Sequence, residues 1–313
     1  MSIINDPIHN SAAPVLSSRF GFPVREDVAL TNAKGENKPA IEKDFQKLMA
    51  AVSAPLTRVL EAGETVFWAS RAMPPIHAFE QLTLGWAMYR YYNVGLVFTD
   101  RRLIIFGLTS SGVWRGTIKH VRWDRMTKLK AGGFFTQALS FKVGKKPFNY
   151  TRLGARNAKK IKTLLPFLTA ANPAGAMADP LASGVESLCP RCVRPPAPRV
   201  YTCPNCAMTF KDERTLALRA LIPGGAYFYI GWTGIGILTG LFECIILLAL
   251  VGTLADPTGS KGQDAAPLGF MVGYYLFLIA LEKGLGYLHA RRFIREFEPI
   301  KVADANTPAA TAQ

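Results

Sequence analysis

The chain has 313 residues, 49% of them hydrophobic, and carries 37 Lys and Arg residues against 22 Asp and Glu residues, a formal net charge of +15 at pH 7. This length suffices for two modest folded units, and the apolar share is ordinary for a globular protein, which excludes a largely disordered chain. The charge is unevenly placed. From Asp100 to Lys162, sixteen Lys and Arg residues stand against two Asp residues, so one segment carries nearly the whole surplus.

The first part of the chain has little apolar periodicity. Residues 1–39 are rich in Asn, Ser, Ala and Pro, so we expect them to be unstructured. They also lack the basic and then apolar pattern of a secretory signal, so we expect this part to stay in the cytoplasm. Ile41, Phe45, Leu48 and Val52 then recur at helical spacing, which predicts an amphipathic helix that ends near Pro55.

Strands are predicted next, because from Glu64 to Leu153 the apolar period changes to two. The stretch GLVFTDRRLIIFG, residues 95–107, predicts two apolar strands around a tight polar turn at Thr99–Arg102. In residues 139–143 apolar residues alternate with Ser and Lys, which predicts an antiparallel sheet with its basic residues outward. A helix should follow and end at Pro166.

This order of strands and one closing helix, and above all VFTDRRLIIF at Val97–Phe106, resembles the bacterial PH-like and GRAM-like superfamily, in which a TDRR-type turn recurs in an apolar hairpin. The resemblance covers Glu64–Leu165, about a third of the chain. It implies an α+β fold: a PH-like antiparallel β-barrel or sandwich with a C-terminal helix. The segment Arg71–Tyr92 is long for a connection between early strands, and its structure is not predicted.

The basic segment predicts a surface that attracts anions. Scattered lysines are usually a solvated face, but an excess of fourteen positive charges on about sixty residues is better explained by attraction to anionic lipid. We expect attraction to a surface rather than a stereospecific phosphoinositide pocket. The candidate surface-binding residues are Lys128, Lys130, Lys142, Lys145, Lys146, Lys159 and Lys160.

Four of the five cysteines form two CPxC pairs, and the ligands they offer are Cys189, Cys192, Cys203 and Cys206. Four thiolates on two tight loops suit a tetrahedral zinc ion without a large core. The pattern resembles zinc ribbons and rubredoxin-like knuckles. Because four cysteines leave no open position, the expected Zn²⁺ is structural. A redox dithiol normally uses one CxxC pair, and iron in the same ligand set ranks below zinc.

Two apolar runs near the C-terminus are long enough to cross a bilayer. Between Tyr227 and Leu254 there is no Lys or Arg, and Glu243 is the only charged residue, so this run can span a core of about 30 Å. The second run begins at Pro267 and ends before a cluster of arginines. Soluble core helices rarely run this long without a polar face, so we expect an integral membrane protein with two crossings.

Flanking charges predict the orientation of this pair. Basic residues precede the first crossing and follow the second, whereas the loop ADPTGSKGQDAAP has one Lys against two Asp, so both termini should face the cytoplasm at the plasma (inner) membrane. The cysteines then lie in a reducing compartment, which argues against disulfides. Glu243 should lie near mid-depth and Glu282 towards the cytoplasmic end, so we expect them not to face each other.

No catalytic motif is present: the four His residues form no metal-binding pair, and GxSxG, HExxH and a phosphate-binding loop are missing. We therefore expect a non-enzyme, with no catalytic residues: a membrane-anchored adaptor that presents a basic domain and a zinc ribbon to a protein partner or anionic lipid. The alternative is a membrane-tethered regulator that binds nucleic acid. It is weaker because Phe134, Phe135, Phe141 and Phe148 mostly occupy alternating positions that are better explained as core. Transport ranks last, because two helices make a poor path.

The predicted organisation follows the chain from end to end. Its segments are an unstructured N-terminus (1–39), an amphipathic helix (40–61), the PH-like domain (62–169), a linker (170–187), the zinc ribbon (188–212), an interfacial segment in which Leu216 and Leu221 face the membrane (213–225), a first crossing (226–254), an external loop (255–267), a second crossing (268–291) and a cytoplasmic tail (292–313).

Overall fold

The structure is a computed structural model that describes residues 16–76, 88–170, 184–255 and 268–300. It divides into two compact units, residues 1–208 with 301–313 and residues 209–300. We call their described parts the sheet unit (16–208) and the helical unit (209–300). Most of Arg71–Tyr92, the loop after residue 255 and the tail from residue 301 lie outside the described residues, as do residues 1–15.

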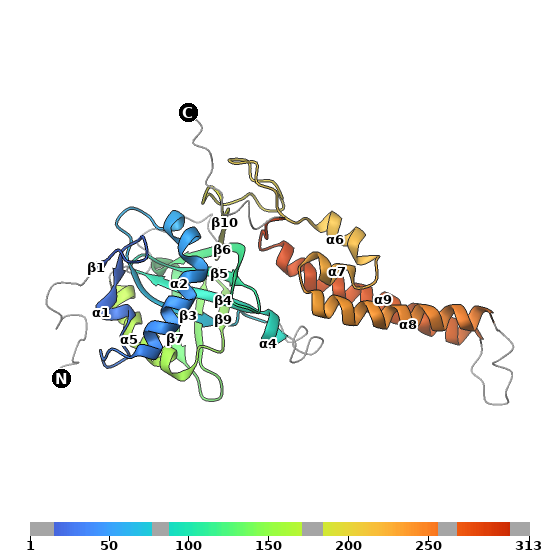
Figure 1. Cartoon of the computed structure of the whole chain (residues 1–313), viewed down its shortest axis with the longest axis horizontal. Helices are drawn as coiled ribbons and strands as arrows, with labels where there is room; N and C mark the ends of the chain where they lie inside the picture. The colour runs from blue at the N-terminus through green and yellow to red at the C-terminus, as the bar shows by residue number, and fades with distance from the viewer. Residues whose placement is uncertain (1–15, 77–87, 171–183, 256–267, 301–313) are drawn as a thin grey trace. The chain divides into compact units, whose positions relative to one another are not determined.

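The sheet unit contains a seven-stranded sheet of order β1-β2-β3-β4-β5-β6-β10 (Figure 1). From β3 to β6 neighbouring strands are antiparallel, and β10 adds antiparallel to β6. The strands are β1 (Leu16–Ser17), β2 (Val24–Arg25), β3 (Val66–Ala72), β4 (Asn93–Thr99), β5 (Arg102–Leu108), β6 (Trp114–Arg122) and β10 (Glu186–Leu188).

A second, three-stranded antiparallel sheet consists of β7 (Met126–Gly132), β8 (Ala138–Val143) and β9 (Lys146–Tyr150). A single 3₁₀ turn at Trp123–Arg125 leads into it from β6. Within the described residues the two sheets are not closed into one barrel. The α+β class is therefore observed, and the closed barrel is not.

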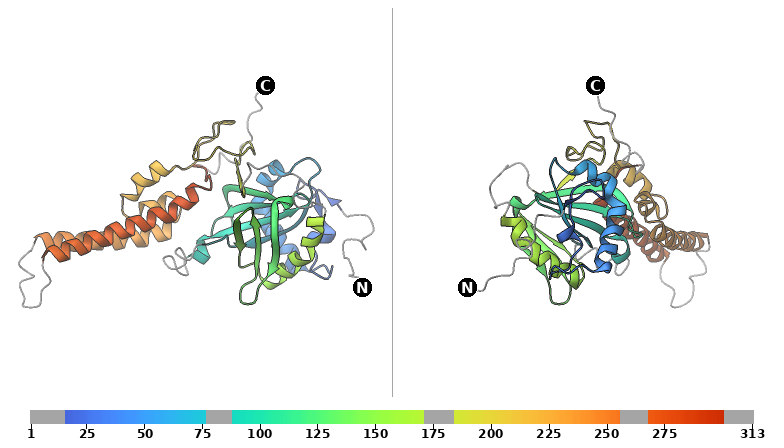
Figure 2. Two further views of the ribbon diagram at one scale, coloured as in Figure 1. Left: turned by 180° about the vertical axis from the view of Figure 1, so that it is seen from behind. Right: turned by 60° about the vertical axis from the view of Figure 1, so that its left-hand side comes forward.

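Among the described residues of the sheet unit, four helices accompany the sheets: α1 (Glu26–Ala29), α2 (Pro39–Val59), α4 (Met88–Tyr91) and α5 (Ala155–Ala170). Helix α2 packs on β3, and α5 packs on β7, beside the three-stranded sheet in Figure 2. The core between these layers includes Trp68, Phe98, Trp123 and Phe141, each at most 2% exposed. Burial of these large side chains is the main force that holds the layers together.

The structure confirms one predicted hairpin and extends one predicted helix. The hairpin around Thr99–Arg102 is confirmed as β4 and β5. Helix α2 was expected to end near Pro55, but it continues to Val59 because Leu56 and Val59 are buried. Burial of one further turn offsets the hydrogen bond that a proline removes.

Two more expectations are wrong for the same physical reason, tertiary burial. Helix α5 passes through Pro166 to Ala170, and Leu168 in its last turn is buried. The N-terminus was expected to be unstructured as far as residue 39, but residues 16–38 contain β1, β2 and α1, and Val24 is fully buried. The end of the expected linker, residues 186–187, belongs to strand β10.

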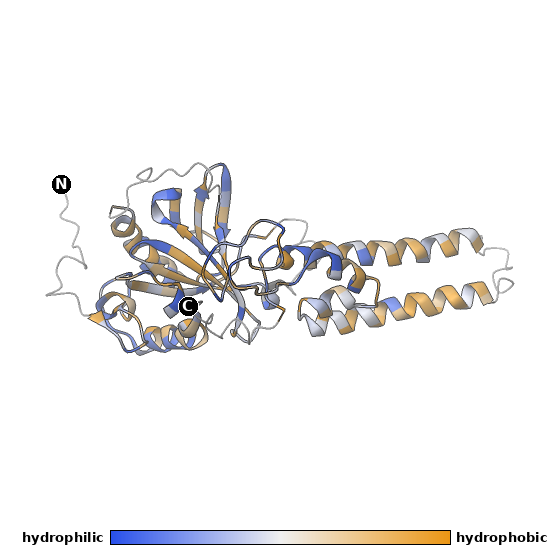
Figure 3. Cartoon of the chain, turned by 90° about the horizontal axis from the view of Figure 1, so that it is seen from above, coloured by the Kyte–Doolittle hydropathy of each residue, from blue (hydrophilic) through white to orange (hydrophobic). Residues whose placement is uncertain are grey.

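The helical unit contains α6 (Glu213–Ala220), α7 (Gly225–Tyr229), α8 (Thr233–Ala255) and α9 (Leu268–Ile294). Helices α8 and α9 are long and apolar enough to cross a membrane, and Figure 3 shows the apolar residues along both. Most of their large side chains are exposed, unlike those of a core helix in a soluble protein. The helix expected from residue 226 is interrupted at Ile230–Trp232, where Gly231 has a φ of +79°.

Candidate metal centre and neighbouring surfaces

The two CPxC loops have the same backbone geometry. In the first, the N–H of Cys189 donates to Arg194 O and the N–H of Val193 donates to Cys189 O. In the second, Cys203 and Ala207 make the equivalent bonds to Met208 and Cys203. Val193 and Ala207, each directly after the second cysteine of its pair, have φ values of 61° and 55°. Two copies of one tight loop thus present the cysteines.

The loops bring the four cysteine sulfurs together. All four lie within 4.8 Å of one another, with Cys189 to Cys206 at 3.6 Å and Cys192 to Cys203 at 3.5 Å. A tetrahedral ion with bonds of about 2.3 Å to sulfur separates its ligands by about 3.8 Å, whereas a disulfide needs about 2.05 Å. The four cysteines are not disulfide-bonded. This set of donors fits a metal ion.

The protein environment shifts the pKa values of the cysteine thiols in different directions. Burial raises the pKa of the Cys189 thiol, although backbone N–H groups oppose the shift. Burial also raises the pKa of Cys192. For Cys203, burial acts in the same direction, but the N–H groups of Asn205 and Cys206 donate to the sulfur and bring its pKa below the ordinary value. A metal must therefore displace a proton from the buried Cys189, and such sites bind metal more weakly as the pH falls.

Arg58, on α2, is a neighbour of this centre that the sequence did not reveal. Its charge interacts with that of Cys189, and burial lowers the pKa of its guanidinium. Its two terminal nitrogens are buried and make no hydrogen bond within the described residues. A cation near a cysteine favours the thiolate form of its sulfur. No spacing in the sequence connects residue 58 with residue 189, so only the packing of α2 shows this pair.

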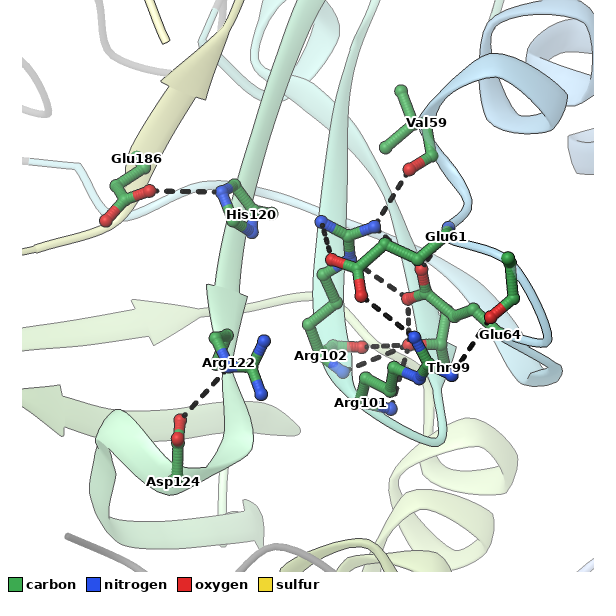
Figure 4. Close-up of polar contacts among 11 residues, drawn as sticks. Val59, Glu61, Glu64, Thr99, Arg101, Arg102, His120, Arg122, Asp124 and Glu186 are labelled. Atoms are coloured by element: carbon green, nitrogen blue, oxygen red, sulfur yellow. Dashed lines mark hydrogen bonds and ion pairs between the residues drawn. The ribbon is translucent and has the colours of Figure 1, made fainter. Parts of the chain in front are cut away.

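Strand β10 attaches the cysteine loops to the large sheet, because Leu188, its last residue, directly precedes Cys189. Glu186 accepts from Arg125 at 2.6 Å and lies 3.2 Å from His120 Nε2 (Figure 4). Burial and the charge of Arg102 lower the pKa of His120, while Glu186 opposes them. His120 is therefore mainly uncharged at neutral pH, and the ion pair between Glu186 and Arg125 is the one that persists there.

The TDRR turn forms a buried polar network rather than an exposed site (Figure 4). The Arg102 guanidinium donates to both oxygens of Glu64 and to Val59 O. The Thr99 hydroxyl is 2.7 Å from Glu64 Oε1, and Arg101 donates to Glu61 at the surface. Because Glu64 is fully buried, this network holds β4 and β5 to the end of α2.

The predicted basic residues fall mostly on the three-stranded sheet. Lys128 and Lys130 lie on β7, Lys142 on β8, and Lys145 and Lys146 at the β8–β9 turn. Lys142 is half-buried and the other four are exposed. Lys130 pairs with Ser140, which alternates with the buried Leu139 and Phe141, so the sheet has a polar outer face and an apolar inner face. Lys159 is exposed on α5.

Lys160 does not belong to this surface, and its inclusion is corrected. It is 5% exposed, and its ammonium donates to Thr31 Oγ1 at 2.9 Å and to Asn32 O at 3.1 Å. The ammonium also lies 5.7 Å from the centre of the Trp68 ring. A step of one residue along a helix turns the side chain to a different face, so the adjacent Lys159 and Lys160 have opposite environments.

The expectation that the four phenylalanines of this segment are mostly core residues holds for Phe141 and Phe148 and is wrong for the other two. Phe141 is buried and Phe148 packs beside it, but Phe134 and Phe135 are 93% and 95% exposed. They lie in the loop between β7 and β8, where the pairing of the two strands has ended at Gly132 and Ala138. Phe134 and Phe135 are adjacent and follow two glycines, so they do not alternate with polar residues as the residues of a strand would. This lack of alternation is the sign in the sequence that they lie in a loop.

The helical unit contains a second polar cluster, again contrary to expectation. The Lys283 ammonium donates to a Glu243 carboxylate oxygen and, at 2.9 Å, to Ile222 O. The other Glu243 oxygen accepts from Gly224 N, and Glu243 is 1% exposed. Glu282 hydrogen-bonds Glu243 and lines the same small cavity, so the two carboxylates do face each other.

The segment expected to lie on the membrane with Leu216 facing it is also corrected. Leu216 is fully buried within the helical unit, whereas Leu218 and Leu221 are 62% and 74% exposed. Helix α6 packs against α7 and α9, and its first residue, Glu213, pairs with Arg291 and Arg295. The apolar face of α6 is therefore used inside the unit.

Comparison of the chain with protein-family models, with curated proteins and with solved structures gives no match in any of the three.

Proposed function

We propose that this protein is a membrane-anchored, non-enzymatic adaptor. In this proposal α8 and α9 cross the plasma (inner) membrane with both termini in the cytoplasm, and the sheet unit rests on anionic lipid through its basic outer face. The cysteine loops, stabilised by one Zn²⁺, present a rigid surface to a protein partner near the bilayer.

The observation that carries the proposal is the gathering of exposed lysines on one small sheet. Lys128, Lys130, Lys145 and Lys146 are exposed and Lys142 is half-buried, and the five come from the three strands and one turn of this sheet, whose apolar side is buried. Each basic residue near an anionic bilayer contributes about 1 kcal/mol of attraction. A chain that carries two helices suited to a bilayer keeps this face within reach of lipid.

A PH-like identity for the sheet unit is supported by the order of its elements. Four consecutive antiparallel strands, β3 to β6, precede a three-stranded antiparallel sheet and then helix α5. This is the succession that the resemblance of Val97–Phe106 implies. The buried Arg102–Glu64 pair gives the TDRR turn of this chain a structural role within that succession.

Zinc is the proposed metal because four cysteines give a closed tetrahedral shell that suits it. Cys189 and Cys203 are buried, and few apolar side chains surround the two loops, so the ion would supply much of their folding free energy. Elemental analysis of the purified chain should find one zinc per chain. The Cys192→Ser/Cys206→Ser variant should lose it, and a wild-type chain with no transition metal would contradict the proposal.

Lipid contact is tested with the full chain in nanodiscs of neutral lipid and of mixed neutral and anionic lipid. Acylation of lysines, mapped by mass spectrometry, should slow at Lys130 only in the anionic discs, and high salt should abolish the effect. Lys43 and Lys47, exposed on α2, are the matched controls. Equal labelling in both kinds of disc would refute the proposal.

Nucleic acid remains the second candidate, because the exposed Phe134 and Phe135 beside lysines would suit stacked bases. The same labelling in neutral discs with single-stranded DNA at moderate salt separates the two. Protection of Lys130 by DNA, without protection by anionic lipid, would favour the regulator over the adaptor.

A further inference from the structure

We propose that the loop between β7 and β8 inserts Phe134 and Phe135 into the bilayer interface, so that the sheet unit docks on anionic lipid by the tip of this hairpin. This inference rests on the proposed function and adds the contact residues and the direction of approach. Nothing in the repeated cysteine loops or in the TDRR turn is involved.

Exposure of the pair is the first observation. At 93% and 95%, Phe134 and Phe135 are the most exposed large apolar side chains in the described part of the chain. Their rings contact each other edge to face, with centres 4.8 Å apart, and together they form one apolar projection. Exposed apolar surface of this kind on a folded unit marks an interaction site.

The loop is built to hold the rings outward. A Cβ on Gly133 would lie 2.0 Å from Thr136 O, so only glycine permits this close turn. The Gln137 side chain donates to Gly133 O at 2.8 Å and closes the loop, and Leu153 N donates to Gln137 O. These contacts fix the base of the loop while the two rings make none with the sheet core, since neither belongs to the buried cluster.

The positive charge next to the two rings indicates that the loop contacts anionic lipid. Lys130 is four residues before Phe134, or at most about 13 Å from it at about 3.3 Å per residue, and Lys128 is two residues further away. The headgroup layer outside the hydrocarbon core is about 5 to 8 Å thick on each side. Rings at the acyl boundary would therefore place Lys130 at the outer edge of the headgroup layer, where its long side chain can extend towards lipid phosphates. Aromatic residues favour this depth, and basic residues beside them add attraction to anionic lipid.

Docking by the tip differs from docking by the flat outer face in one measurable respect. Lys145 and Lys146 lie at the β8–β9 turn, at the opposite end of β8 from the phenylalanine loop. Tip docking predicts that anionic nanodiscs slow the acylation of Lys130 more than that of Lys145. Flat docking predicts equal protection of the two, and that result would overturn the inference while leaving the proposed function in place.

Depth is measured directly with the full chain in nanodiscs whose lipids carry brominated acyl chains, which quench tryptophan. The Phe134→Trp variant should show quenching beyond that of the wild type, and the gain should be larger with anionic than with neutral lipid. The matched control is Val113→Trp, at a position 59% exposed in the β5–β6 loop, which should show no gain. Retention of zinc by each variant verifies its fold.

Each other result of the quenching and labelling experiments would support or refute tip insertion. No gain for Phe134→Trp with protected lysines would refute tip insertion alone, and no gain without lysine protection would refute both proposals. Equal gain in neutral and anionic discs would support insertion and refute the role of charge. Emission changes caused by single-stranded DNA but not by lipid, or a dimer in solution that Phe134→Ala/Phe135→Ala dissociates, would assign the loop to nucleic acid or to a second copy and overturn the inference.

Discussion

Arg102 and Glu64 form a two-pronged ion pair inside the sheet unit: Nε lies 3.0 Å from Oε1 and Nη2 lies 2.7 Å from Oε2. Burial alone would raise the pKa of Glu64, but hydrogen bonds from Arg102 and Thr99 and from backbone bring it below the ordinary value. The TDRR turn thus connects the β4–β5 hairpin to the residues that follow α2 by charge as well as by backbone pairing.

Removing one partner of this pair should destabilise the sheet unit strongly. Glu64→Gln leaves the Arg102 guanidinium buried beside a neutral amide, so we expect the free energy of unfolding to fall by about 3 to 5 kcal/mol. Urea unfolding of the full chain in detergent, followed by tryptophan emission, measures it. Glu42→Gln, which affects a pair with Arg19 near the surface, should cost less than about 1 kcal/mol.

The same pair has a defined pH dependence. A carboxylate whose pKa is lowered on folding stabilises the protein above its unfolded pKa, here an ordinary value of 4.5, and loses that contribution as the pH falls through the folded pKa. The difference in stability between the wild type and Glu64→Gln should therefore shrink below pH 4.5. A difference that stays constant to lower pH would contradict the assignment.

Lys160 should also make stability rise with pH, but in the alkaline range. Burial lowers its pKa to about 8 from 10.5, with the charge of Asp27 acting against the shift. Between these values the unfolded chain binds more protons than the folded chain, so this residue makes stability rise with pH. Relative to Lys160→Met, the wild type should gain about 2 kcal/mol between pH 8 and pH 10. Parallel thermal-midpoint curves for the two proteins would refute this.

Replacement of Val193 or Ala207 by glycine should stabilise the cysteine loop that contains it. Val193 and Ala207 have left-handed backbone conformations, which cost residues with a Cβ about 1 kcal/mol each. Because folding of the loops is coupled to metal binding, Ala207→Gly should tighten zinc affinity about fivefold in competition with a chelator. Ala197→Gly, in the same module but without a positive φ, is the control and should leave affinity unchanged or slightly weaker.

The Glu243–Lys283 pair should be necessary for the helical unit. Lys283→Met leaves the buried Glu243 carboxylate without its ammonium, and we expect a loss of about 3 to 5 kcal/mol in unfolding by SDS titration. Glu243→Gln/Lys283→Met removes both charges and should recover most of that loss. Equal stability of the single variant and the wild type would show that Glu243 has another partner.

The local sequence determined those features that depend on short spacing or on composition. The TDRR hairpin follows from alternation around a polar turn, the two apolar helices follow from long runs without charge, and the CPxC pairs follow from a repeated four-residue loop. In each case the residues that matter are neighbours in the chain, so the pattern contains the geometry.

Only the tertiary structure decided which face each residue occupies and which distant residues meet. Lys159 and Lys160 are adjacent but have opposite environments, and Arg58 lies near Cys189 because α2 packs there. Pro55 and Pro166 lie inside helices because burial of the following turn offsets a lost hydrogen bond. Burial is a property of the folded packing, summed over segments far apart in the chain, and no short window of the sequence contains that sum.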